Sequence, residues 1–356
     1  MEVMASVIVP AYNAAPYIEE CIASLMRDAL PLEIIVVNDG STDDTSQRVR
    51  AFARSGGHSI VLLEQPNQGL SSARNAGLRA ARGRFIGLVD GDDWVDSGMF
   101  TTMVTAAVER GADLVICNGE MVDHQSRSMR PFHDDTRFRT LAERYTTPVD
   151  PTAVPDMFRL DTSACKRLYA RALLERASFQ FADGLLFEDV LAHYQLLFAS
   201  RTCLLLDRPF YKYRINHPGR ITDKKGRDIL TIFEVLRRSQ DTLRAHGATD
   251  EIWANFVWFQ SWVLRWLASQ IDGAHQRAFL DGVVAVGRRC PRSGVIAFQR
   301  LFNDDLLAQR AVVLQMLGWK KAFLDIARDA ASEWDRPVFR LATRMKRFAP
   351  LLGQRS

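Results

Sequence analysis

The chain has 356 residues, of which 47% are hydrophobic and 25% charged, and this predicts a globular protein with a main domain and a second region. Its formal net charge of +4 is small, and no basic stripe joins stacking aromatic residues in the first 130 positions, so nucleic-acid binding is not expected. The five scattered cysteines, an odd number without a close pair, argue against a disulfide framework and a zinc site and suit a reducing cytosol.

The chain also lacks the usual signals for export or for a membrane span. Its N-terminus shows no basic segment followed by an apolar one, so we expect no secretion signal and a cytoplasmic protein. Residues 252–271 form the most apolar helical stretch, but they include too many polar side chains for a helix that faces lipid. We interpret this stretch as a buried amphipathic helix.

In the first third of the chain, short β-branched runs alternate with helical stretches. This alternation predicts an α/β fold with a mostly parallel sheet flanked by helices. The predicted strands are Ser6–Val9, Glu33–Asn38, Ile60–Glu64, Phe85–Val89 and Leu114–Cys117, and the predicted helices are Ala15–Arg27, Thr42–Arg54, Ser71–Arg82 and Ser97–Arg110.

The pattern changes after residue 122. Residues 123–156 show no clean period, which predicts an irregular connection. From 227 to 347 every strong pattern is helical, so we predict a catalytic domain at 1–225 and a helical domain at 226–356. Between these regions we expect helices at Cys165–Ala177 and Glu188–Ala199 and strands at Cys203–Leu206 and Phe210–Tyr213.

Three polar motifs directly follow predicted strands. They are Pro10-Ala-Tyr12-Asn13, Asn38-Asp39-Gly40-Ser41 and Asp90-Gly-Asp92-Asp93. In an open α/β sheet the C-terminal ends of the strands form the edge where ligands bind, so we expect the three motifs to share one site.

The Asp90–Asp93 motif carries the strongest signal. A nucleotide diphosphate needs a hard divalent cation held by oxygen ligands, and neighbouring carboxylates can serve the ribose and the metal separately. A surface turn is the alternative, because Asp and Gly are common turn residues. The buried strand before the motif and Trp94 after it favour a functional site.

Two further segments could reach the same nucleotide. Asp39 could accept a hydrogen bond from the base, although its motif could equally cap the next helix. Residues 67–77 begin with small side chains and could bring a helix N-terminus and Arg74 to the nucleotide. The alternative for this segment is a plain loop-to-helix joint with Arg74 in solvent.

The motif Phe187-Glu188-Asp189 opens a predicted helix. Sugar transfer needs one carboxylate that takes the proton of the acceptor hydroxyl, and either acidic residue has the right chemistry. The alternative is helix capping by acids in the first turn, and this motif by itself favours that alternative.

Together the four motifs resemble those of family 2 glycosyltransferases of the GT-A fold. The resemblance is close over residues 4–120 and looser over 160–222, where it includes Ala164–Tyr169 and Phe187–Asp189. It implies a GT-A domain and transfer of a sugar from a nucleotide-diphosphate donor, such as a UDP-sugar, to a saccharide or lipid-linked saccharide acceptor in cell-surface polysaccharide synthesis.

The resemblance also implies roles for single residues. It assigns the nucleobase to Pro10, Tyr12 and Asp39, the ribose to Asp90, and a Mn²⁺ or Mg²⁺ ion to Asp92.

The resemblance further places Arg74 near the nucleotide and makes Asp189 the catalytic base, with Glu188 as its neighbour. A single base opposite the leaving diphosphate implies inversion at the anomeric carbon. Processive relatives carry several membrane spans, and this chain shows none, which implies transfer of one sugar per encounter.

A loop after residue 213 holds three further candidates. Arg214 and Arg220 could clamp the diphosphate as a lid closes, and His217 could be an added metal or phosphate ligand. The alternative for His217 is an ordinary loop histidine without a ligand.

Two features mark the C-terminal region. Trp258, Trp262 and Trp266 form one helical stripe, for which core packing is the default and an acceptor or dimer face the alternative. Residues 336–356 contain six basic residues and no acidic one, interleaved with apolar ones. This pattern is consistent with a helix on an anionic membrane surface at the inner face of the membrane, or with a solvated terminal helix.

Two other functions compete with glycosyl transfer. A nucleotidyltransferase would need a Gly-rich, basic phosphate loop after the first strand, where this chain has Pro10-Ala-Tyr-Asn13. A non-catalytic module that binds nucleotide sugars or glycans would not need both Asp92 and Asp189.

Overall fold

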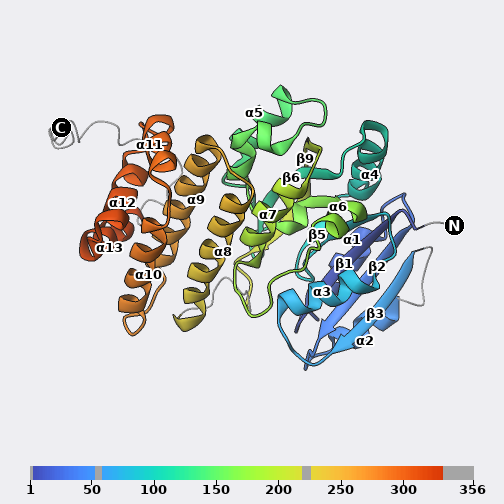
Figure 1. Cartoon of the computed structure of the whole chain (residues 1–356). Helices are drawn as coiled ribbons and strands as arrows, with labels where there is room; N and C mark the ends of the chain where they lie inside the picture. The colour runs from blue at the N-terminus through green and yellow to red at the C-terminus, as the bar shows by residue number, and fades with distance from the viewer. Residues whose placement is uncertain (1–2, 53–57, 219–225, 332–356) are drawn as a thin grey trace.

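A computed structural model describes residues 3–52, 58–218 and 226–331. The sheet with its helices forms one end of the molecule, and the C-terminal helices form the other (Figure 1). The sheet order is β3-β2-β1-β4-β8-β6-β9-β5, and β7 pairs with β6. The strands are β1 Ala5–Ala11, β2 Leu32–Asp39, β3 Ser59–Gln65, β4 Phe85–Leu88, β5 Trp94–Val95, β6 Leu114–Asp123, β7 Met129–Pro131, β8 Arg167–Ala170 and β9 Cys203–Ile215.

The predicted α/β fold with a helical C-terminal region is confirmed, but the sheet is mixed. Strands β3, β2, β1 and β4 run parallel, whereas β8 runs antiparallel to both of its neighbours, β4 and β6. Strand β9 is parallel to β6, and the short strands β5 and β7 are antiparallel to their partners. Six of the nine described strands, namely β3, β2, β1, β4, β6 and β9, therefore run in one direction, and β8, β5 and β7 run against it.

The first helices lie where the sequence places them, with shorter ends. Helix α3 covers one face of β1 and β2, and α1 and α4 pack on the other face. Alternate residues of β1 divide between the two faces, since Val7 and Val9 join the large core and Ile8 packs under α3. The helices of this region are α1 Ile18–Leu25, α2 Thr45–Phe52, α3 Leu70–Ala80, α4 Met99–Arg110, α5 Asp135–Arg144, α6 Arg171–Arg176 and α7 Glu188–Ala199.

Helix α3 lies unusually close to the sheet, and a glycine makes this possible. A Cβ atom on Gly77 would lie 2.3 Å from Cγ2 of Ile8. The helix that carries Arg74 is therefore held directly against the central strand β1.

Three predictions about the middle of the chain are wrong. Of the helix expected at 165–177, only α6 Arg171–Arg176 is helical; the segment begins with a 3₁₀ turn and strand β8, because Arg167, Leu168 and Tyr169 are buried between β4 and β6. The two strands expected at 203–206 and 210–213 form one strand, β9. A bulge opposite β6 accommodates the polar residues Asp207 and Arg208, so the strand continues beyond them. The connection at 123–156 contains strand β7 and helix α5.

The described part of the C-terminal region is helical. Its helices are α8 Thr231–Ala245, α9 Asp250–Ala268, α10 Gln276–Arg288, α11 Arg292–Leu301, α12 Leu306–Leu317 and α13 Lys320–Ala331. Side chains of α8, α9 and α10 share one continuous hydrophobic core with the sheet. The predicted domain boundary at 225 falls in 219–225, and the basic segment 336–356 falls in 332–356; both lie outside the described residues. The division into two domains stays a prediction.

The buried helix predicted at 252–271 corresponds to α9. Most of its residues are buried, including Asn255, Gln260 and Ser261. Within the described ranges, no helix combines the length and the apolar character needed to cross a membrane.

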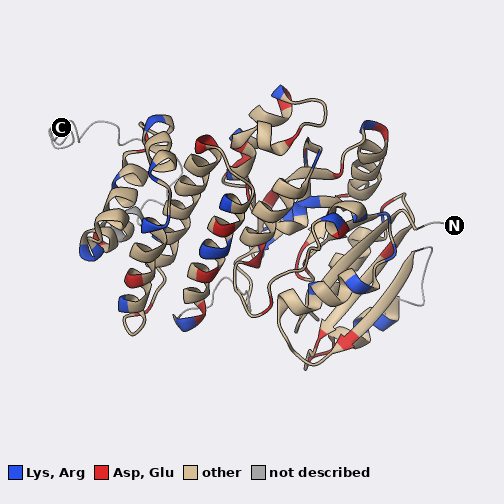
Figure 2. Ribbon diagram, viewed as in Figure 1, with Lys and Arg blue, Asp and Glu red and all other residues tan. Residues whose placement is uncertain are grey.

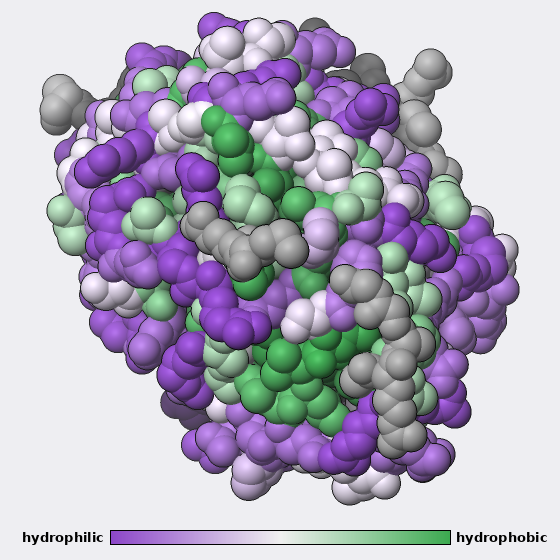
Figure 3. All heavy atoms as spheres, turned by 90° about the vertical axis from the view of Figure 1, so that its right-hand side faces the viewer, coloured by the Kyte–Doolittle hydropathy of each residue, from purple (hydrophilic) through white to green (hydrophobic). Residues whose placement is uncertain are grey.

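The end of the molecule formed by the sheet shows an apolar patch surrounded by polar residues (Figure 3). Strand β3 is the edge strand on this side, and its residues Ile60–Leu63 are only half-buried.

Candidate active site

The three motifs predicted to share one site lie together at the C-terminal ends of β1, β2 and β4. The Asn13 N–H donates to Oγ of Ser41 (2.9 Å), and Oδ1 of Asn13 accepts from the Thr42 N–H (2.8 Å). The Gly91 N–H donates to the Pro10 carbonyl (3.2 Å), and a Cβ on Gly91 would lie only 2.9 Å from that oxygen. The absence of a side chain at Gly91 thus allows the acidic motif to lie against β1.

Asp39 is buried and organises the loop before α3. Its Oδ1 accepts from the Gln68 N–H (2.9 Å) and from Nε2 of Gln65 (2.8 Å), and its Oδ2 accepts from the Gly69 N–H (2.8 Å). The carboxylate is therefore held in one orientation. Tyr12, on the neighbouring loop, is 53% exposed, whereas Pro10 is buried within β1.

Arg74 is the centre of a buried charge cluster. Its Nη1 donates to Oε1 of Glu188 (2.7 Å) and to Oδ1 of Asp189 (2.6 Å), and its Nη2 donates to Oδ1 of Asp90 (3.0 Å). The guanidinium also lies over the ring of Phe181. One arginine from α3 thus joins the acidic motif after β4 to the acidic start of α7, and the solvated alternative for Arg74 is wrong.

Three carboxylates share this single cation, and burial raises the pKa of two of them, Glu188 and Asp90. Burial raises the pKa of Glu188 to about 7; the negative charge of Asp189 adds to the rise, and Arg74 opposes it. Burial also raises the pKa of Asp90, against the effect of Arg74. The cluster therefore favours a proton on Glu188 near neutral pH, which leaves Arg74 to pair with the two aspartates.

Asp189 differs from Glu188 in its access to solvent. The Asp189 side chain is 22% exposed and that of Glu188 8% exposed. Oδ2 of Asp189 accepts a hydrogen bond from the Ala164 N–H (3.3 Å). Phe187, just before α7, adopts the left-handed conformation (φ 66°) and so turns the chain into the helix at this point. Of the two acidic residues, Asp189 is therefore the more accessible to solvent.

Asp92 and His217 form a second pair at the same edge. Oδ2 of Asp92 lies 3.1 Å from Nε2 of His217, and the imidazole is nearly completely buried. The ring of His217 packs edge-on against Tyr17. The side chain of His217 is therefore held beside Asp92 by burial and by its contact with Tyr17.

Arg214 holds the acidic motif in its conformation. Its Nε donates to the Asp92 carbonyl (2.7 Å), its backbone N–H donates to Oδ1 of Asp93 (2.7 Å), and its Nη2 pairs with Glu20 (2.6 Å). The guanidinium is buried over the ring of Trp94. These contacts show that Arg214 holds the backbone and side chains of the acidic motif in place. Its predicted contact with a diphosphate stays a prediction.

Asp93 is part of the same framework. It accepts a hydrogen bond from the Tyr211 hydroxyl (2.5 Å), and burial raises its pKa well above the usual range, with a further rise from Asp92 and Asp90. Arg220, the remaining candidate of the predicted lid, lies outside the described residues.

Comparison with known proteins identifies the family. A model described as glycosyl transferase family 2 matches residues 6–169. Succinoglycan biosynthesis protein ExoO of Rhizobium meliloti is 30% identical over 278 residues, covering 77% of this chain and 73% of ExoO. The uncharacterized glycosyltransferase EpsJ of Bacillus subtilis is 36% identical over 222 residues. This chain belongs to glycosyl transferase family 2.

The matches to several relatives cover only part of those proteins. The alignment with EpsJ spans 62% of this chain and 63% of EpsJ, and that with GlyA of Streptococcus pneumoniae spans 59% of this chain and 30% of GlyA. Residues 1–349 of S. aureus TarS, solved in complex with UDP-GlcNAc, share the fold with a TM-score of 0.75 at 19% identity, covering 93% of this chain and 92% of that structure.

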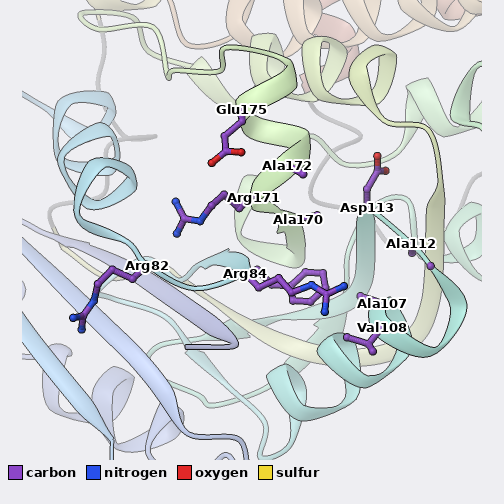
Figure 4. Close-up of a pocket in the computed structure, with 12 residues that line it drawn as sticks. Arg82, Arg84, Ala107, Val108, Ala112, Asp113, Ala170, Arg171, Ala172 and Glu175 are labelled. Atoms are coloured by element: carbon purple, nitrogen blue, oxygen red, sulfur yellow. The ribbon is translucent and has the colours of Figure 1, made fainter. Parts of the chain in front are cut away.

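A cavity of about 480 Å³ lies away from the family site, at the opposite edge of the sheet. It is lined by the start of β4, the residues before β6 and the start of α6 (Figure 4). Two of its three arginines make hydrogen bonds within the protein, since Arg171 donates to the carbonyls of Ala81 and Gly83 and Arg82 donates to Glu33. We assign no ligand to this cavity.

Several residues of the site carry no signal in the sequence. Glu20 and Tyr211, which anchor Arg214 and Asp93, come from α1 and β9 and have no motif around them. Ala164 donates its backbone N–H to Asp189, and a backbone contact does not depend on the type of side chain. Only the Ala164–Tyr169 segment, part of the looser family resemblance, pointed to this region.

Proposed function

We propose that the protein is an inverting glycosyltransferase that uses a divalent metal ion to move one sugar from a nucleotide-diphosphate donor to a saccharide hydroxyl. The observation that carries the proposal is the cluster around Arg74, in which the partly exposed Asp189 and the strand-end residue Asp90 share one guanidinium. This proximity supports a proton acceptor and a nucleotide site that share one edge of the sheet.

For the donor, we propose that Asp39 and Tyr12 receive the nucleobase and that Asp90 receives the ribose. The carboxylate of Asp39 is already fixed by two backbone N–H groups, and Tyr12 is exposed beside it. The TarS structure with UDP-GlcNAc supports a UDP-sugar donor, since a protein of the same fold binds one. ExoO, named for succinoglycan biosynthesis, supports a saccharide acceptor, which a lipid could carry.

The residues present fit a metal ion only in part. Among the described residues, no group of three or more His, Cys, Asp and Glu side chains could hold one. Oδ2 of Asp92 and Nε2 of His217 nevertheless lie 3.1 Å apart and offer one oxygen and one nitrogen donor. We propose that these two atoms hold Mn²⁺ or Mg²⁺ together with oxygens of the diphosphate; the nitrogen donor favours Mn²⁺. A mannosyltransferase of Pyrobaculum calidifontis with this fold was solved with GDP-Man and Mn²⁺.

In the proposed reaction Asp189 takes the proton of the acceptor hydroxyl. The acceptor oxygen then forms its bond to the anomeric carbon as the bond from that carbon to the diphosphate oxygen breaks, which inverts the configuration. A bound metal ion would stabilise the charge on the departing diphosphate. Arg74 orients Asp189, and a proton on Glu188 leaves the positive charge of Arg74 to pair with the two aspartates.

A thermal-shift screen of UDP, GDP, CDP and ADP, each with and without Mn²⁺, tests the donor part of the proposal. One nucleotide should stabilise the protein with Mn²⁺ and not without it, by about 2.7 kcal/mol at a ligand concentration 100 times its Kd. Asp189→Asn should keep this shift and lose transfer. The proposal is wrong if no nucleotide gives a shift, or if Asp189→Asn transfers normally.

The five cysteines are free and buried, which supports a reducing compartment and hence the proposed cytoplasmic location.

A further inference from the structure

Helix α9 reverses the usual amphipathic pattern. From Ile252 to Ala268 every residue is buried except Trp258, Trp262 and Trp266, which are partly exposed. The exposed side of a helix normally carries polar and charged residues, and here it carries tryptophans. Figure 2 shows α9 with almost no charged residues beyond its first turn, whereas α8 carries them along its length. The side of α9 that solvent reaches is therefore aromatic.

The first of these tryptophans, Trp258, has partners within the protein. Its Nε1 donates to Oδ2 of Asp305 (2.9 Å). The guanidinium groups of Arg137 and Arg159 both lie over its ring. These contacts account for the position of Trp258 as part of the packing of the protein.

The other two tryptophans belong to a row of four aromatic rings. The ring of His133 stacks on Trp262 with centroids 5.1 Å apart, and Trp262 stacks on Trp266 at 6.3 Å. Phe187 lies nearly perpendicular to Trp266, also at 6.3 Å. Near-parallel rings in van der Waals contact with this centroid distance are displaced sideways by about 5 Å, so part of each face stays uncovered. These four side chains, the aromatic row, are all at least partly exposed.

Both ends of the aromatic row are connected to the proposed catalytic base. Phe187 directly precedes α7, which carries Asp189 in its first turn. At the other end, Nδ1 of His133 lies 4.0 Å from Oδ2 of Asp161. The segment from Asp161 continues to Ala164, whose backbone N–H donates to Asp189. The row and this segment therefore lie next to the carboxylate that is proposed to take the acceptor proton.

Asp161 supplies a fixed carboxylate beside the rings. Its Oδ1 accepts a hydrogen bond from the Ser163 N–H (3.1 Å) and pairs with Nζ of Lys166 (3.1 Å). Against the effect of burial, the charge of Lys166 lowers the pKa of Asp161 to about 2, so the carboxylate is ionised at neutral pH. The Asp161 side chain is still 14% exposed. Aromatic side chains with a few fixed polar groups are the usual composition of a site for a small molecule.

We propose that the acceptor saccharide lies along the aromatic row, with its reacting hydroxyl at Asp189. The C–H groups on the faces of pyranose rings pack on aromatic rings, whose faces carry partial negative charge. Sugar hydroxyl groups can donate to Asp161. A row of several rings fits an acceptor of at least two sugars. The inference rests on the proposed function, since it takes Asp189 as the base.

A second copy of the chain is the competing occupant of the aromatic row. A protein partner on these rings would lie against Asp189 and obstruct the group that has to meet the acceptor. A saccharide uses the same rings and brings the hydroxyl whose proton Asp189 takes. The position of the row next to the proposed base therefore favours the saccharide.

Saccharide binding to the full chain tests the inference. The probes are cellotetraose and chitotetraose, each titrated by isothermal calorimetry with and without UDP and Mn²⁺. Trp266→Ala should weaken binding by at least about tenfold, because an aromatic contact is lost, and Trp262→Ala should weaken it in the same direction. Trp266→Phe keeps a ring and should bind within about threefold of the wild type. Trp258→Phe is the matched control, because it lies on the same side of α9 and its contacts lie outside the aromatic row.

The expected result is binding of at least one tetrasaccharide by the wild type, loss in Trp266→Ala, recovery in Trp266→Phe and no change in Trp258→Phe. Thermal melting of each variant establishes that it is folded. Equal binding by the wild type and folded Trp266→Ala would overturn the inference, as would absence of binding of both probes by the wild type. A wild-type dimer that Trp266→Ala converts to a monomer with unchanged saccharide binding would overturn it in favour of a second copy.

The inference and the proposed function fail separately. Saccharide binding that depends on Trp266, in a protein whose Asp189→Asn variant transfers normally, contradicts the proposed base and supports the aromatic row. Loss of transfer in Asp189→Asn, together with unchanged saccharide binding in Trp266→Ala, supports the proposed base and overturns the row.

Discussion

Glu188→Gln should make the stability of the protein less sensitive to pH. Burial raises the pKa of Glu188 from 4.5 to about 7 in the folded protein. Between these two values the folded state binds a proton that the unfolded state has released, so the free energy of unfolding falls as pH rises. The stability that Glu188 contributes is fully present below pH 4.5 and is lost as pH passes 7. A difference of about 2.5 pKa units corresponds to about 3 kcal/mol.

Urea or thermal unfolding at several pH values between 4.5 and 7.5 measures this difference. Relative to Glu188→Gln, the wild type should lose about 3 kcal/mol over this range, or about 4 °C in Tm for a chain of this length. Glu234→Gln is the control, because the hydrogen bond from Arg237 lowers the pKa of Glu234 to about 2, so that the contribution of Glu234 to stability changes little above pH 4.5. Parallel stability curves for the wild type and Glu188→Gln would refute the account of the Arg74 cluster.

Other predictions concern the reaction, the metal and the packing of α3. Asp189→Asn should lower transfer by roughly two to four powers of ten with unchanged nucleotide affinity, measured by release of nucleoside diphosphate; near-normal turnover would exclude Asp189 as the base. Asp92→Asn and His217→Gln should each weaken Mn²⁺-dependent nucleotide binding in isothermal titration, and unchanged affinity in both would remove the metal from this pair. Gly77→Ala should destabilise the protein by about 1–3 kcal/mol in urea unfolding, because its methyl group would overlap Ile8; a stabilised variant would contradict the close packing of α3.

Much of the fold could be predicted from local sequence because the relevant signals are local. An apolar run followed by a polar motif marks the end of a strand, and β1, β2 and β4 all end where those motifs begin. Parallel strands then bring the motifs to one edge without further information. The helical character of the C-terminal region likewise follows from the period of its apolar residues.

The prediction failed where tertiary burial overrides local pattern. Residues 165–170 have a helical period, but pairing with two neighbouring strands makes residues 167–170 a strand. The polar Asp207 and Arg208 interrupt the local pattern of β9, yet a bulge lets the strand continue past them.

The sequence by itself therefore determined at which edge of the sheet the candidate site residues gather. Only the tertiary structure decided how they act on one another. Arg74 meets Glu188, 114 positions away, and His217 meets Asp92 across a comparable separation. No local period reports such contacts, because they depend on how α3, α7 and the end of β9 pack against the sheet. The exposure of Leu306 and Leu317 on α12 has the same origin, since the apolar pattern of a helix does not show which of its sides the fold leaves in solvent.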